Sequence, residues 1–258
     1  MEQNLSKKTR TESDLIGSRE VPKSALYGVQ TLRGIENFRI SKFHLNEYPL
    51  FIQALAITKM GAAVANRELD LLTEEQADAI LKACKEILEG KHHDQFPVDM
   101  IQGGAGTTTN MNANEVIANR ALELMGHQRG EYQYCSPNDH VNRSQSTNDA
   151  YPTAIHIGLY YTHLKLVKHF EVLIESFRKK ATEFAHVIKM GRTQLEDAVP
   201  MTLGQTFNGF ASILSHEIKN LDFAAQDFLA VNMGATAIGT GITAEPEYAE
   251  KCIAALRK

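Results

Sequence analysis

The 258-residue sequence has few of the features that mark secreted, metal-binding or membrane proteins. Its three cysteines, Cys84, Cys135 and Cys252, are odd in number and widely spaced, which fits neither a disulfide framework nor a zinc site. No apolar run approaches the roughly 18 residues that a membrane-spanning helix needs. The first ten residues are polar and lack the apolar core of a secretory signal. These absences predict a cytoplasmic protein without a bound metal or a membrane partner.

The sequence also lacks a strong excess of charge. Lysine and arginine together number 27 and aspartate and glutamate 31, so the net charge is −4. This mild acidity argues against a general nucleic-acid-binding protein. An anionic ligand would have to be held by local dipoles and hydroxyl groups, because the field of the whole protein does not attract it.

Apolar residues recur at helical spacing along most of the chain, which predicts an all-α fold. Residues 49–68 form one expected helix, and Thr73 with Gln76 forms a capping box at the start of the next. A third helix is expected at about residues 111–125. Residues 1–45 mix short apolar pieces with glycine, proline and charge, so irregular structure and turns are expected there.

The second half of the sequence predicts much longer helices. Residues 152–188 form a 37-residue helical pattern, about 55 Å long at 1.5 Å per residue. A compact globule of this chain length would be roughly 47 Å across. A second long helix is expected at 200–231. A third begins near Pro246, and its apolar stripe is still running at Lys258. These patterns predict either a bundle completed by other chains or an incomplete polypeptide.

Three polar loops precede predicted helices, two of them directly and the third by a few residues. They are residues 103–116 (GGAGTTTNMNANEV), 136–149 (SPNDHVNRSQSTND) and 191–202 (GRTQLEDAVPMT). A helix N-terminus presents unpaired N–H groups and the positive end of the helix dipole. Any one loop is explained more simply as a helix cap. Three such loops together, with more hydroxyl and amide groups than caps need, predict a site for a small dicarboxylate.

Other candidate sites are weaker. His92 and His93 have no carboxylate or cysteine at metal-ligand spacing, so a solvated loop is expected. His140 fits an anion ligand and a helix cap equally well. The glycine-rich segment 234–241 is not a dinucleotide fingerprint, because no strand precedes it and its glycine spacing differs. The sequence therefore predicts no cofactor.

The three loops resemble conserved blocks of the fumarase/aspartase superfamily, and in detail those of its aspartase branch. The similarity runs in order from EVPKSALYGVQTLRGIENF to VNMGATAIGTG, which is nearly the whole chain. The resemblance implies an all-α homotetramer in which loops of different subunits form each active site. It implies an N-terminal lyase domain over residues 1–145, followed at 146–258 by the truncated first part of a central bundle of long helices.

The resemblance also implies a reaction, the reversible elimination of ammonia from L-aspartate to give fumarate through an enediolate-like intermediate. Six residues are carried over by motif as substrate-binding: Thr107, Ser146, Thr147, Asn148, Thr193 and Gln194. The first three would contact the β-carboxylate, where negative charge develops. The other three would surround the departing amino group. No cofactor takes part in the implied reaction.

Two alternative functions remain at this point. Fumarases resemble GRT-His where this sequence has Gln194, and an imidazole transfers protons whereas a glutamine does not. Because the glutamine carbonyl accepts from an ammonium group, the ammonia-lyase reaction is favoured. A non-catalytic helical assembly protein on the same scaffold is the second alternative.

The family's catalytic serine lies on a Gly-Ser-Ser loop that nothing in this sequence matches. No catalytic residue is therefore assigned within the 258 residues. The chain is expected to be an N-terminal portion without lyase activity of its own.

Overall fold

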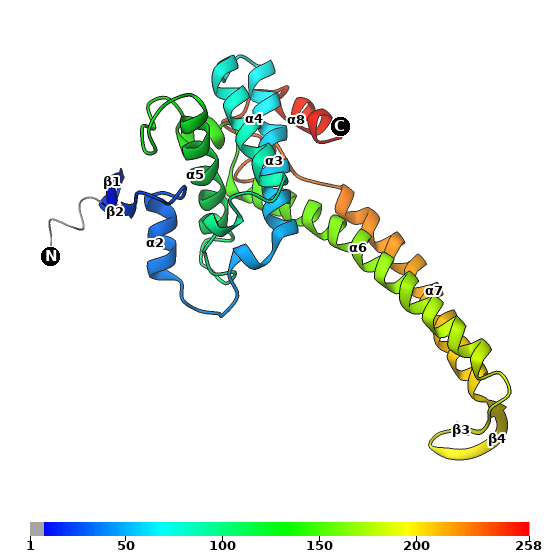
Figure 1. The fold of residues 1–258 in the computed structure, drawn as a ribbon. Coiled ribbons are helices and arrows are strands. Elements are labelled where there is room, and N and C mark those ends of the chain that lie inside the picture. Colours follow the sequence, from blue (N-terminus) through cyan, green and yellow to red (C-terminus); the bar gives the residue numbers. More distant parts are fainter. Residues whose placement is uncertain (1–7, 258) are drawn as a thin grey trace. The chain divides into compact units, whose positions relative to one another are not determined.

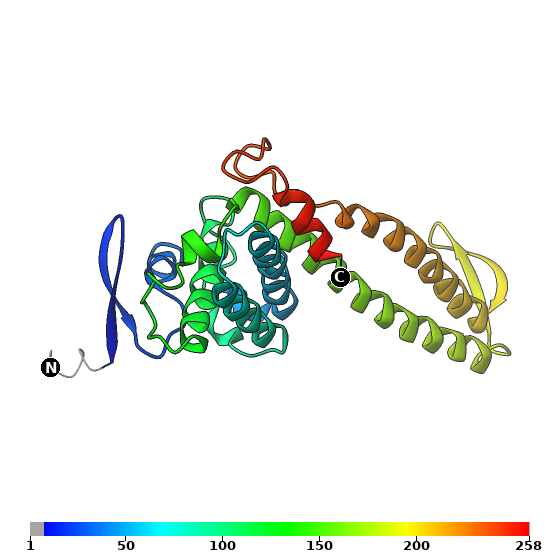
Figure 2. The same cartoon turned by 90° about the horizontal axis from the view of Figure 1, so that it is seen from above.

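Helices form most of the molecule, which confirms the expected fold class (Figures 1 and 2). The computed structural model describes residues 8–257. They divide into a first unit, residues 8–158 with 231–257, and a second unit, residues 159–230. These units are defined by contacts within this chain, so the domain boundary expected after residue 145 stays a prediction.

The first unit begins with more regular structure than the sequence indicates. Strands β1 (Thr9–Asp14) and β2 (Gly17–Pro22) form an antiparallel hairpin, and helix α2 (Val29–Asn37) follows. The carboxylate of Glu115, 85 or so residues away in sequence, accepts hydrogen bonds from the first N–H groups around α2. Local sequence reasoning missed this helix because its N-terminal cap comes from a distant segment.

The core of the first unit lies among α3 (Pro49–Glu68), α4 (Glu74–Leu88) and α5 (Thr107–Leu124), which pack side by side (Figure 1). Helix α3 has the expected bounds, and the capping box of Thr73 and Gln76 is confirmed. Helix α5 begins four residues earlier than expected. Fully buried apolar side chains fill the core, among them Ile52, Leu55, Ile80, Ile87, Ile117 and Leu122.

Helix α8 (Tyr248–Leu256) packs against α3 within the first unit. Tyr248 and Cys252 are fully buried in a small apolar cluster with alanines of α3. Gly61 permits the close approach, since a Cβ there would lie 2.7 Å from a methyl carbon of Leu256. Within this chain α3 thus covers Tyr248 and Cys252, and completion of the bundle by other chains stays a prediction.

Helix α6 (Thr147–Glu183) has the expected 37 residues, but it begins and ends five residues earlier than 152–188. Its first turns belong to the first unit and the remainder to the second. Pro152 lies inside the helix and has no N–H to donate to the carbonyl of Asn148. The side-chain amide of Asn232 donates to that carbonyl instead, at 3.1 Å. A distant side chain thus compensates for the proline.

In the second unit, the later part of α6 runs beside α7 (Leu203–Ala225), which is followed by the short helix η4 (Gln226–Leu229) (Figures 1 and 2). Their contact includes a cluster of aromatic rings: Phe177, Phe184, Phe207 and Phe210. Strands β3 (Ile188–Thr193) and β4 (Glu196–Thr202) form a hairpin that connects the end of α6 to the start of α7. The helix expected from residue 200 therefore starts at Leu203, because the preceding residues pair as a strand.

Candidate active site

The N-terminus of α6 carries three of the six predicted site residues. The hydroxyl oxygen of Ser146 accepts from the backbone N–H of Asn148 at 3.2 Å. In return, the carboxylate of Asp149 accepts from the N–H of Ser146 at 2.9 Å. Ser146 is therefore a true helix cap. Its hydroxyl proton has no acceptor among residues 8–257, so it remains available to a ligand.

A buried polar network fixes the side chain of Thr147. Its hydroxyl oxygen accepts from the side-chain amide of Asn110, in the first turn of α5, at 3.1 Å. The ammonium group of Lys59, on α3, donates to Asn110, Asn142 and Gln145 at 2.8, 3.0 and 2.8 Å. All three ammonium protons therefore have amide oxygen acceptors. The network fixes the position of the Thr147 hydroxyl.

Lys59 is only 1 % exposed, and no carboxylate among the described residues forms an ion pair with it. Burial lowers the pKa of Lys59 to about 7, because the charged form loses its hydration, while the negative charge of Asp149 opposes the shift. A bound dicarboxylate would bring negative charge toward this buried cation. In the sequence, only a single lysine within an apolar helix pointed to this network. The partners of Lys59 could not be recognised there, because they lie on other elements.

The first glycine-rich loop is strained where it enters α5. Gly104, Ala105 and Gly106 all have positive φ angles, of 76°, 51° and 92°. Alanine rarely adopts this left-handed conformation, and such strain concentrates at functional sites. Thr107 is exposed, and its hydroxyl donates to the carbonyl of Gly104 at 2.7 Å. Thr107 is the first residue of α5, and its exposed hydroxyl oxygen can still accept a hydrogen bond.

The first two predicted loops lie next to each other. A Cβ atom on Gly106 would collide with the ring of Tyr151, which belongs to the first turns of α6. The bond between Asn110 and Thr147 joins the same two helix ends. The N-termini of α5 and α6, with Thr107 on one and Ser146 and Thr147 on the other, are thus packed together.

The third predicted loop is a hairpin in the second unit. Thr193 ends β3, and Gln194 and Leu195 form the two-residue turn. Both turn residues are exposed and have positive φ angles, 48° and 68°, where asparagine and glycine are usual. The loop lies ahead of α7 as expected, and strand β4 fills the residues between Gln194 and the start of the helix. Whether Thr193 and Gln194 share a site with the other four residues stays a prediction.

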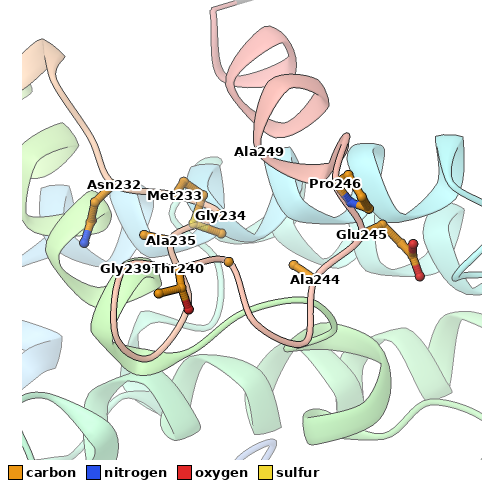
Figure 3. Close-up of a pocket in the computed structure, with 11 residues that line it drawn as sticks. Asn232, Met233, Gly234, Ala235, Gly239, Thr240, Ala244, Glu245, Pro246 and Ala249 are labelled. Carbon is orange, nitrogen blue, oxygen red and sulfur yellow. The ribbon is translucent and has the colours of Figure 1, made fainter.

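A fourth loop, residues 232–241, contacts the N-terminus of α6 and was not among the predicted site segments. Asp149 accepts from the N–H groups of Gly234 and Thr236, and the side-chain amide of Asn148 donates to the carbonyl of Ala237. The loop also lines a cavity of about 580 Å³, together with residues 244–246 and Ala249 of α8 (Figure 3). In the sequence, only the repeated small residues of this loop indicated a close contact with another segment.

The weaker histidine candidates have ordinary partners. His92 contacts Glu86 at 3.0 Å, and His93 bonds the carbonyl of Ile87. The ring of His140 accepts from the N–H of Ser136 at 2.7 Å, and burial lowers its pKa. Within residues 8–257, no three histidine, cysteine or acidic side chains gather as a metal site would require. In the same part of the chain, no helix is long and apolar enough to cross a bilayer.

The fold is mostly helical, the N-termini of α5 and α6 are packed together, and comparison with known proteins gives the class of protein. Residues 17–258 match the protein family described as Lyase, and the chain belongs to this family. It is 56 % identical over 245 residues to the aspartate ammonia-lyase of Escherichia coli K12, covering 95 % of this chain and 51 % of the relative. The aspartate ammonia-lyase of Pseudomonas canavaninivorans is 58 % identical over 240 residues, with 93 % and 51 % covered.

Solved structures show the same similarity. A fumarate lyase:delta crystallin from Brucella melitensis, bound to cobalt, superposes with a TM-score of 0.93 at 51 % identity, covering 96 % of this chain and 54 % of that one. A class II fumarase from Schistosoma mansoni gives a TM-score of 0.87 at 36 % identity, with 96 % and 52 % covered. The resemblance to the aspartase branch is confirmed. The chain spans about half the length of the curated relatives it matches.

Proposed function

We propose that this protein acts as an ammonia-lyase that converts L-aspartate reversibly into fumarate and ammonia. The observation that carries the proposal is the N-terminus of α6, where Ser146, Thr147 and Asn148 are consecutive. Asn110 connects this helix end to the buried ammonium of Lys59 by hydrogen bonds. The relatives named aspartate ammonia-lyase, at 56–58 % identity, support the choice of substrate.

The β-carboxylate of the substrate would bind at the packed ends of α5 and α6. Removal of a proton from the neighbouring carbon makes this carboxylate doubly charged in the enediolate-like intermediate. Hydroxyl groups of Thr107, Ser146 and Thr147, the helix dipoles and Lys59 would stabilise that charge. In comparable sites, the loss of one preorganised donor costs about 2.7–4 kcal/mol. The proton would pass to the serine that the resemblance places in a segment with no match here.

The amino group would leave from the side formed by Asn148, Thr193 and Gln194. Amide and hydroxyl oxygens accept hydrogen bonds from an ammonium group without changing their own protonation. The turn at Gln194 supports this role, since non-glycine residues with positive φ concentrate at functional sites.

Assembly into a homotetramer is part of the proposal, with sites shared between subunits. The second unit exposes apolar side chains on both of its helices, and the most exposed of these are Val172, Ile213 and Phe223, at 68, 60 and 84 %. Exposed apolar surface of this kind is typical of an interface. A cytoplasmic location fits the three buried, unpaired cysteines.

The test is a completed enzyme, made by joining residues 1–258 to the remaining half of the Escherichia coli relative. Absorbance of fumarate is followed with L-aspartate and with L-malate as substrates. We expect turnover of L-aspartate alone. Turnover of L-malate would show a fumarase, and no turnover of either would favour the non-catalytic scaffold. The 258 residues by themselves should give no sustained fumarate production.

A further inference from the structure

We propose that residues 232–237 act as a positioning element that turns the side-chain amide of Asn148 so that its oxygen faces the amino group of the substrate. The inference rests on the proposed function and deepens it. In this proposal the loop, held by Asp149, makes the site prefer an amino group over other groups on a dicarboxylic acid.

The orientation of the Asn148 amide follows from one contact. Its nitrogen donates to the backbone carbonyl of Ala237 at 2.8 Å. The oxygen at the other end of the amide has no donor among residues 8–257, and the side chain is exposed. An ammonium group carries only donors, whereas a carboxylate carries only acceptors. The amide oxygen therefore matches an amine and repels a carboxylate.

Asp149 holds the loop against α6. It is fully buried, and its carboxylate accepts from three backbone N–H groups, those of Ser146, Gly234 and Thr236, at 2.9, 3.1 and 2.9 Å. Hydrogen bonds to a charged acceptor are stronger than neutral ones. One side chain thus fixes both the helix cap and the loop that orients the next residue, Asn148.

Asn232 adds a second tie between the same segments. Its side-chain amide donates to the carbonyl of Asn148, which Pro152 leaves without its helical donor. Met233 anchors the start of the loop in the apolar cluster of Tyr248 and Cys252, whereas residues 237–240 are all exposed. The position of Ala237 therefore depends on the hydrogen bonds to Asp149, and weakening them should release the Asn148 amide without disturbing the core among α3, α4 and α5.

The loop itself is tested on the 258-residue chain by amide hydrogen exchange. Asp149→Asn should speed exchange at Gly234 and Thr236, because both N–H groups donate to the same carboxylate oxygen, Oδ2. In asparagine that place holds either an amide nitrogen, which accepts no hydrogen bond, or a neutral oxygen, which accepts more weakly than a charged one. Asp70→Asn is the matched control: it removes the same charge at an exposed position whose φ of 57° asparagine tolerates. Unchanged exchange at Gly234 and Thr236 in Asp149→Asn would overturn the proposal.

The amine specificity is tested in the completed enzyme. Asp149→Asn should raise KM for L-aspartate about tenfold, while the inhibition constant of succinate, which has both carboxylates and no amine, changes less than about threefold. Asn232→Ala should give a smaller shift of the same kind, and Asp70→Asn none. If succinate and L-aspartate weaken equally, the loop has only a structural role and the proposal is wrong.

Different outcomes separate the proposed function from the role of residues 232–237. If the completed wild-type enzyme does not use L-aspartate, the proposed function is wrong and the amine assignment falls with it. If the wild type is active but Asp149→Asn and Asn232→Ala leave the ratio of the two constants unchanged, the proposed function stands and this inference is overturned.

Discussion

The two units of the chain differ in how far they bury their own apolar side chains. In the first unit, Ile52 and Ile117 are fully buried, and α8 covers the remaining face of α3. In the second unit, Val172 and Phe223 stay largely exposed although they lie on long regular helices. The comparison shows that the first unit forms its core within one chain, whereas the second leaves apolar side chains of its helices uncovered by any of residues 8–257.

The largest effect should come from a matched pair of Ile→Ala substitutions, one in the core of the first unit and one on the surface of the second. Ile117→Ala, in α5, should lower the free energy of unfolding by about 2–5 kcal/mol, because it leaves a cavity in a packed core. Ile213→Ala, in α7, should cost less than about 0.5 kcal/mol in a monomer, because this side chain is 60 % exposed.

Urea unfolding of both variants measures this difference. Equal losses at low protein concentration would mean that the two units do not differ as described. A loss for Ile213→Ala that grows with protein concentration would place this residue in an interface between subunits.

Thr147→Ala should separate activity from stability in the first unit. Removing the hydroxyl should reduce turnover by the completed enzyme about 10²–10³-fold, as for one donor to a developing charge. Stability should change by only about 1 kcal/mol, because within residues 8–257 the hydroxyl makes one hydrogen bond, to Asn110. Steady-state kinetics and urea unfolding check the two parts, and a loss of stability without a loss of turnover would reduce Thr147 to a structural residue.

Lys59 should make the stability of the first unit depend on pH. Its folded pKa, about 7, lies below the value of 10.5 for an exposed lysine, so the unfolded chain binds more protons between these values. Stability relative to Lys59→Met should therefore rise from pH 7 to pH 9, by up to about 1.4 kcal/mol per pH unit. Unfolding of both proteins across this range measures it; a difference that stays constant or falls would show that Lys59 remains charged.

The smallest predicted effect concerns the turn in the second unit. Gln194→His in the completed enzyme should lower turnover of L-aspartate about tenfold or more, because an imidazole that titrates replaces an amide acceptor. Folding should be unaffected, since Gln194 is exposed in its own chain. Fumarate formation from L-aspartate is the measurement. Unchanged turnover would remove Gln194 from the site and leave Thr193 as the candidate from the second unit.

Local patterns predicted the helices well where caps and periodicity lie close in sequence. Helix α3 has the expected bounds, and α4 has the expected capping box. The prediction was less accurate where a tertiary contact decides the bounds. Helix α6 begins before Pro152 because Asn232 supplies the missing donor, and β4 takes residues that were expected in a helix or a loop.

The candidate site shows the same division. Threonine, serine and asparagine at helix ends were visible in the sequence, because caps and polar clusters are local signals. The residues that hold them were not. Lys59 and Asn110 lie 51 positions apart, and Asp149 reaches Gly234 and Thr236 across 85 and 87 positions.

The sequence by itself determined the helical class, the length of α6 and the polar character of its N-terminus, because helix periodicity and capping depend on residues a few positions apart. Only the tertiary structure decided which distant groups support that helix end. Burial gives Lys59 and Asp149 their importance, since a charged group removed from water must find its partners wherever the fold brings them.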